Sequence, residues 1–270
     1  MKKHWLILPY YLWLAVFTVV PLALIVFYAV TKQYSFELTL ANLERSMAPV
    51  YLEVLFWSVL LAAVSTFICF LLGYPLAYIL SQINAKYRSM LVMLVIVPMW
   101  MNFLLRTYAW LTLLEKNGFI NVILSTLHLP AQHLLYTDAA VVLGMVYNFL
   151  PFMVLPIYSV LIKMDKSLLE ASADLGATRI QTFRKVIFPL SLPGVYAGIL
   201  MVFMPAVTTF VISRLLGGGQ YMLIGNVIEE QFLVVGNWNF GSAVSIVMLI
   251  IIMLSLGFIM KNKKEGGMFL

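Results

Sequence analysis

Long apolar stretches separated by short polar ones dominate this sequence and limit what it can fold into. A helix needs about 20 consecutive apolar residues to cross the roughly 30 Å hydrocarbon core of a bilayer. Only 10% of the 270 residues are charged, whereas a water-soluble domain carries about 25%. The sequence therefore predicts an all-α integral membrane protein whose six transmembrane helices form a single domain. The predicted spans are residues 6–30, 54–80, 90–114, 139–162, 190–212 and 240–260.

The first of these stretches follows two lysines and could be read as a signal peptide. It is longer than the apolar core of such peptides, and no small-x-small cleavage site precedes the next polar segment. We therefore expect a retained helix. Pro21 lies inside it and is expected to bend it.

The basic residues predict how the spans are oriented. With a cytoplasmic N-terminus, 12 of the 17 Lys and Arg residues fall in inner segments, four in outer segments and one, Arg106, within a span. Such an excess marks the cytoplasmic side. We therefore expect both termini in the cytoplasm, in a multi-pass membrane protein. The orientation in the lipid bilayer explains the excess of basic residues behind the net charge of +6, so no nucleic-acid partner is required.

The longest inner segment, residues 163–189, carries two signals for the start of a helix. Ser167 stands three residues before Glu170, and Thr178 stands three residues before Gln181. Both spacings fit a capping box, in which the first side chain and the fourth bond each other's backbone amides. The segment is therefore expected to contain two successive helices.

A glycine separates these two predicted helices. Gly176 stands where a left-handed residue commonly ends a helix, so we expect a first helix over residues 168–175 and a second one running towards Pro189. A two-turn helix is not stable alone in water. It either enters a groove on a cytoplasmic partner or lies on the membrane interface.

This segment resembles the EAA loop of ABC-importer permeases, in which Glu-Ala-Ala is followed by three residues, Gly, nine residues and Ile-x-Leu-Pro. The run Glu170-Ala171-Ser172 has Gly176 and Pro189 at the same spacing, with conservative departures at residues 172, 186 and 188. The resemblance implies a type I importer permease of the bacterial cytoplasmic membrane, whose loop receives motion from an ATPase. The implied coupling residues are Ser167, Leu168, Glu170, Ala171, Ser172, Asp174, Leu175, Gly176 and Pro189.

Other segments resemble the first permease subunit of spermidine/putrescine importers. They are residues 72–80, 96–110, 150–159, 168–183 and 223–232. The resemblance implies a heterodimer with a paralogous permease subunit, a pair of ATPase subunits that bind ATP and Mg, and an extracytoplasmic polyamine-binding protein. This chain is expected to hold no cofactor, because it lacks the Gly-Lys pair of a phosphate-binding loop.

Two other functions are alternatives to a polyamine permease. A type I permease for another small solute would carry the same loop. An integral-membrane enzyme would need a cluster of Asp, Glu, His or Cys at one depth. The pair His128 and His133 in an outer loop has poor spacing for a shared helical face, so no catalytic or metal site is expected.

Polar and aromatic side chains near the middle of the spans are candidates for a substrate path. Prolines beside such side chains suit a gated cavity, and aromatic rings attract alkylammonium groups. Hydrogen bonding between helices explains each single polar residue equally well. The candidates are Trp100, Asn102, Tyr108, Tyr147, Asn148, Thr208, Thr209 and Ser213.

Charged residues near the outer side are expected to affect the entry of the solute and the docking of a binding protein. Arg106 would repel a cation from an open channel, so we expect it to face an outer vestibule or pair with an acid such as Glu115. The outer loop, residues 214–239, is expected to form a short helix over the pore mouth or a re-entrant segment. Its acidic pair, Glu229 and Glu230, would help to dock the binding protein.

Overall fold

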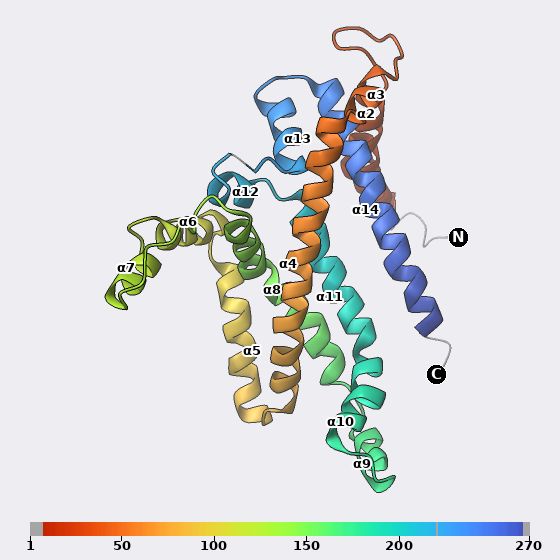
Figure 1. Cartoon of the computed structure of the whole chain (residues 1–270). Helices are drawn as coiled ribbons and strands as arrows, with labels where there is room; N and C mark the ends of the chain where they lie inside the picture. The colour runs from red at the N-terminus through yellow and green to blue at the C-terminus, as the bar shows by residue number, and fades with distance from the viewer. Residues whose placement is uncertain (1–7, 220, 267–270) are drawn as a thin grey trace, which may run out of the picture. The chain divides into compact units, whose positions relative to one another are not determined.

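The computed structural model describes residues 8–219 and 221–266, which form helices joined by turns and loops (Figure 1). These ranges contain no β-strand, only one isolated bridge between Thr31 and Leu38. Five helices are long and apolar enough to cross a membrane, and a bent helix pair is a sixth if it counts as one span. The predicted all-helical membrane fold is confirmed.

The chain divides into two compact units. The first consists of Met1–Trp57 with Leu223–Ser255, and the second of Ser58–Met222 with Leu256–Leu270. Two long helices, α4 (Pro49–Gln82) and α14 (Trp238–Gly266), have residues in both units.

In the first unit, the first span passes through Pro21 without a break. It consists of α1 (Leu8–Leu14), the π-helical turn η1 (Ala15–Val19) and α2 (Val20–Ala29). Proline has no amide hydrogen, and its ring clashes with the carbonyl four residues earlier. The wide turn relieves this conflict, because the Val20 amide bonds the Ala15 carbonyl, five residues back.

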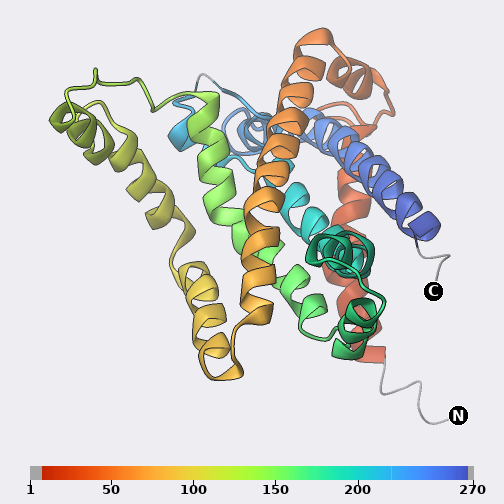
Figure 2. The ribbon, with the colours of Figure 1, turned by 60° about the horizontal axis from the view of Figure 1, so that its bottom comes forward.

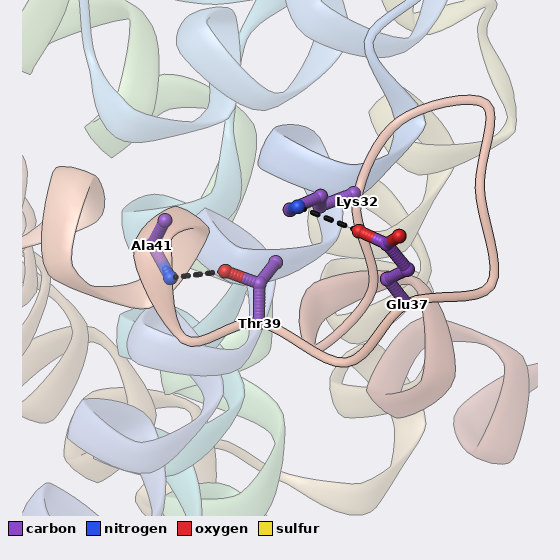
Figure 3. A network of polar contacts seen from close by, with 4 residues as sticks. All are labelled: Lys32, Glu37, Thr39 and Ala41. Atoms are coloured by element: carbon purple, nitrogen blue, oxygen red, sulfur yellow. Dashed lines mark hydrogen bonds and ion pairs between the residues drawn. The ribbon is translucent and has the colours of Figure 1, made fainter.

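The loop after this span is held by local polar contacts (Figure 3). The Lys32 ammonium donates to a Glu37 carboxylate oxygen at 2.6 Å, and this bond and charge lower the pKa of Glu37. The Thr39 hydroxyl accepts a bond from the Ala41 amide, where α3 (Ala41–Ser46) begins. Both charged side chains are exposed, so the pair orders the loop more than it stabilises the fold.

The sixth span is bonded to the end of the first within this unit. The side-chain amide of Asn239, on α14, donates to the Tyr28 carbonyl at 2.9 Å and to the Thr31 carbonyl at 2.9 Å. The neighbouring Phe240 is fully buried and lies under the Arg45 guanidinium, 4.3 Å from its ring centre. The unit also contains α13 (Ile224–Leu233).

The second unit contains the greater part of α4 and the helices from α5 to α12, which include the third, fourth and fifth predicted spans. These helices are α5 (Ala85–Trp100), α6 (Phe103–Leu114), α7 (Phe119–Thr126), α8 (Asp138–Leu161), α9 (Lys166–Asp174), α10 (Arg179–Thr182), η2 (Phe183–Ile187), α11 (Phe188–Thr208) and α12 (Val211–Leu216). The fourth and fifth spans cross closely, because a glycine on α11 lies against the backbone of α8. A Cβ atom added at Gly194 would lie 2.8 Å from the Pro156 carbonyl oxygen.

The third predicted span is not one helix. α5 ends at Trp100, α6 begins at Phe103, and the axis bends by 90° between them (Figure 1). The Asn102 side chain caps α6 by accepting a bond from the Leu104 amide at 2.8 Å, and Pro98 lies in the last turn of α5. The prediction of a continuous helix over 90–114 is therefore wrong.

The fifth predicted span also has different limits. One helical run, Arg179–Thr208, begins well before residue 190, and Pro189 lies inside it instead of ending a loop helix. The chain leaves the helix at Thr209, in an extended conformation, and α12 follows at Val211. The prediction of one helix through residue 212 is corrected accordingly. α4 and α14 cover the second and sixth predicted spans, and α8 covers the fourth except for its last residue, Ile162.

Candidate coupling loop and translocation path

The first helix of the coupling loop, residues 163–189, begins earlier than predicted. The Asp165 carboxylate caps α9 by accepting a bond from the Ser167 amide at 3.0 Å. This bond lowers the pKa of Asp165, which lies outside the membrane spans. Ser167 is thus inside the first turn, and the predicted Ser167–Glu170 capping box is wrong. A carboxylate is favoured at this position because the helix dipole is positive there.

The end of this helix agrees with the prediction. Gly176 has φ +76°, in the left-handed region that favours glycine. Its amide bonds the Ala173 carbonyl at 2.9 Å, and the Ala177 amide bonds the Ser172 carbonyl at 3.0 Å. These two bonds are the Schellman pattern of a helix C-terminus, so the glycine corner is confirmed.

The second predicted capping box is also present. The Gln181 side chain accepts a bond from the Thr178 amide at 2.9 Å, and the Thr178 hydroxyl accepts one from the Gln181 amide at 3.4 Å. From there α10, η2 and α11 form a continuous helical run. The coupling loop is therefore joined to the fifth span without an intervening flexible segment.

The loop presents apolar side chains outside the spans. Leu175 is 88% exposed and Ile180 is 72% exposed, and Leu168 is also exposed. Beside α9, a cavity of about 400 Å³ is lined by the end of α4, the end of α8 and Glu170. Figure 2 shows α9 and α10 side by side at this end of the second unit. An exposed apolar ridge of this kind is typical of a protein-binding surface.

The structure separates the substrate-path candidates of the third span. Trp100, at the end of α5, is 73% exposed and borders a cavity of about 470 Å³ that Tyr158 of α8 also lines. Asn102 caps α6, so its carbonyl oxygen has a structural role. Tyr108 is exposed on α6. These three side chains are not gathered around one described cavity.

The candidates on the fourth span lie beside α6. The Tyr147 ring packs edge-on against Trp110, with 5.4 Å between ring centres. Asn148 is buried, its amide nitrogen donates to the Gly144 carbonyl at 2.8 Å, and its side-chain oxygen has no hydrogen-bond partner among the described residues. The tertiary contact with Trp110 could not be read from spacing along the chain.

The candidates after Pro205 lie around the break between α11 and α12. The Thr208 hydroxyl donates to the Met204 carbonyl at 3.2 Å, and the Ser213 hydroxyl donates to the Phe210 carbonyl at 3.1 Å. Thr209 is buried at the C-terminal cap of α11. These bonds are local to the helix ends, so they support a structural role at least as well as a path.

Arg106 does not have the partner that the sequence suggested. It is 8% exposed on the packed side of α6. Its Nε and Nη1 atoms have no hydrogen-bond partner among the described residues. The expected pair with Glu115 is therefore not formed. A buried, incompletely bonded guanidinium is rare in proteins.

The outer loop contains the short helix that its apolar spacing predicts. α13 spans Ile224–Leu233, with its first residues buried. Glu229 and Glu230 are half-buried on it. Their role in docking a binding protein stays a prediction.

Residues 70–262 match the family of the "Binding-protein-dependent transport system inner membrane component". This match covers more than half of the chain, so the chain belongs to that family. It is a multi-pass component of the inner membrane and part of a transport system, not an enzyme.

Curated relatives resemble the chain over most of its length. The spermidine/putrescine transport system permease protein PotB of Haemophilus influenzae is 41% identical over 241 residues, which cover 87% of this chain and 84% of that protein. PotB of Escherichia coli K12 is 44% identical over 221 residues, covering 81% and 80%. The PotB homolog of Mycoplasma genitalium is 30% identical and covers 90% and 83%.

Solved ABC transporters have the same fold. A chain of a bacterial alginate ABC transporter, crystallised with an alginate-bound periplasmic protein, aligns with a TM-score of 0.81 at 17% identity, covering 95% of this chain and 91% of that one. A chain of the MetNI methionine ABC transporter aligns with a TM-score of 0.55 at 21% identity, covering 79% and 93%. At these identities the likeness concerns the fold alone.

Proposed function

We propose that this chain is the permease subunit of an ATP-driven importer of spermidine or putrescine, and that it forms part of the translocation path by alternating access. The observation that carries the proposal is the identity of 41–44% with permeases named for those polyamines, over more than four-fifths of the chain. The exposed, glycine-ended helix α9 supports the same class of transporter.

The proposed assembly follows from the same resemblance. A paralogous permease subunit forms the heterodimer, two ATPase subunits dock on the cytoplasmic side and bind ATP and Mg, and an extracytoplasmic binding protein delivers the polyamine. In this assembly the chain itself holds no cofactor. The acidic pair Glu229 and Glu230 on α13 would favour contact with a basic surface of the binding protein.

The coupling mechanism uses the continuity of the loop with the fifth span. Closure of the ATPase pair pushes α9, whose exposed side chains, Leu168 and Leu175, provide the docking ridge. The Gly176 corner passes this displacement to α10, and the unbroken helix Arg179–Thr208 carries it into the membrane. Packed helices transmit such a shift because their side chains interlock.

A second candidate is a type I importer of another small solute. The observation that favours it is Arg106, a buried cation with unfilled hydrogen bonds, which suits a neutral or anionic solute better than a polyamine. The coupling loop is the same in both candidates.

Competition for uptake in cells distinguishes the two candidates. We expect cells that express the complete transporter to take up labelled putrescine, and cells without this chain to lose that uptake. Unlabelled spermidine should compete, whereas amino acids and sugars should not. If an unlabelled non-amine solute inhibits the uptake of labelled putrescine, the second candidate is favoured. Unchanged putrescine uptake in cells without this chain would favour it too.

A further inference from the structure

A polar contact joins α9 to α10, the helix that begins the run into the fifth span. Ser172 is the buried residue of α9, at 8% exposure. Its hydroxyl donates to the Leu169 carbonyl at 2.9 Å and lies 3.0 Å from the Thr182 hydroxyl of α10. Either hydroxyl can be the donor in the contact between Ser172 and Thr182. In the described chain no other side-chain hydrogen bond joins α9 to another helix.

The residue after Thr182 contacts a different span. Phe183 packs against Tyr74 and Tyr78 of α4, with ring centres 5.8 and 5.6 Å apart and interplanar angles of 90° and 82°. Tyr74 also lies 5.6 Å from the ring of Phe188, and its hydroxyl is 2.9 Å from the Ser191 hydroxyl of α11. Edge-to-face aromatic pairs of this kind favour one arrangement of their helices.

The wide turn η2 accounts for this aromatic arrangement. Phe183 and Phe188 are five residues apart, which places them about 140° apart around an ordinary α-helix. In η2 the Phe188 amide bonds the Phe183 carbonyl, five residues back, so each turn there is wider than in an α-helix and the two rings lie closer to one face. Both rings therefore reach Tyr74. Pro189, which disfavours an ordinary turn before it, makes the wide turn the preferred form here.

We propose that Ser172 is a positioning residue of the coupling loop. Its bond to Thr182 fixes α9 to α10, next to Phe183, so that a push on α9 reaches α4 through Phe183. In the loop pattern that this segment resembles, alanine stands at this place, and alanine cannot form the bond. The inference rests on the proposed function, because it takes α9 as the helix that the ATPase moves. It adds a second route, into the second span, to the backbone route into the fifth.

A double-mutant cycle on the two hydroxyls tests this positioning role. The complete transporter is reconstituted with its binding protein, and the solute transported per ATP hydrolysed is measured for Ser172→Ala, Thr182→Val and the double variant. Loss of one hydrogen bond predicts a drop of about fivefold in that ratio for each single variant. The double variant should fall no further, because both changes remove the same bond.

Matched variants separate positioning from general damage. Thr182→Ser keeps the hydroxyl and should keep the parental ratio. Ser81→Ala removes a hydroxyl near the C-terminal end of α4 that donates to the Tyr78 carbonyl of the same helix. This variant should also keep the parental ratio. Phe183→Leu, which removes the ring that contacts Tyr74, should lower the ratio as Ser172→Ala does.

Different results would contradict the positioning role of Ser172 and the proposed import of polyamines. Parental ratios for Ser172→Ala and Thr182→Val would overturn the positioning role and leave polyamine import intact. A parental ratio for Phe183→Leu would overturn the route into α4. A parent complex that moves another solute instead of polyamines would overturn the substrate assignment, and the cycle would then be measured with that solute. A parent that moves no solute would overturn both.

Discussion

The Gly176→Val variant is expected to reach the membrane in normal amount and to lose substrate-stimulated ATP hydrolysis and uptake. Gly176 has φ +76°, and a Cβ atom added there would meet nothing within 4 Å. The effect therefore comes from the backbone alone. The left-handed conformation costs an ordinary residue roughly 1–2 kcal/mol, and a β-branched residue is a clear outlier there. Valine would shift this backbone and break the two bonds that end α9.

Two control variants make this result specific to the coupling loop. Gly176→Asn should retain most of the activity, because asparagine tolerates the left-handed region. Gly219→Val changes a glycine with φ +74° and equally open surroundings in the predicted outer loop, residues 214–239, and it should leave coupling unchanged. If Gly176→Val couples like the parent, the loop is not the transmission element. Equal damage from Gly219→Val would indicate a general folding defect.

Gly194→Ala is expected to reduce the amount of folded permease strongly, and Gly73→Ala much less. An added Cβ at Gly194 would lie 2.8 Å from the Pro156 carbonyl oxygen and 3.0 Å from the Ile157 Cα atom, both in the backbone of α8. The two helices would have to separate, and overpacking of this kind costs about 1–3 kcal/mol. At Gly73 the nearest atom, at 2.9 Å, is Cγ of the flexible Met153 side chain.

The comparison is made on permease extracted from the membrane. Its quantity and its thermal unfolding midpoint should both fall further for the Gly194 variant than for the Gly73 variant. Equal midpoints for the two variants would mean that the crossing of α8 and α11 tolerates an extra methyl group. The close backbone contact would then not be a main determinant of the fold.

The sequence was sufficient to predict which segments form apolar helices, because hydropathy and periodicity decide this. It did not reveal the break at Asn102, since the residues on both sides of the break are apolar and hydropathy is insensitive to direction. The signal that could have revealed the break is local: an asparagine four residues after Pro98 is a good N-cap for a new helix. At Pro189 the sequence predicted a helix end that is not there, because the wide turn η2 lets the helix continue through the proline.

Prediction of the coupling loop succeeded where local chemistry decides the structure. Gly176 and the Thr178 capping box depend on neighbours in the chain, and both are present. The cap of α9 was assigned wrongly because two residues compete for it, and spacing alone does not rank Asp165 above Ser167. The substrate path depends on which side chains different helices bring together, such as Tyr147 and Trp110. Spacing along one helix does not contain that information.

Uptake of labelled spermidine by the purified, reconstituted transporter tests the central claim most directly. The complex of this chain with its paralogous permease and ATPase pair is placed in liposomes with ATP inside and the spermidine-loaded binding protein outside. The proposed function predicts ATP-dependent accumulation of spermidine that putrescine reduces by competition and that fails when this chain is left out. Accumulation of a different solute from the same complex, with no spermidine entering the liposomes, would contradict it.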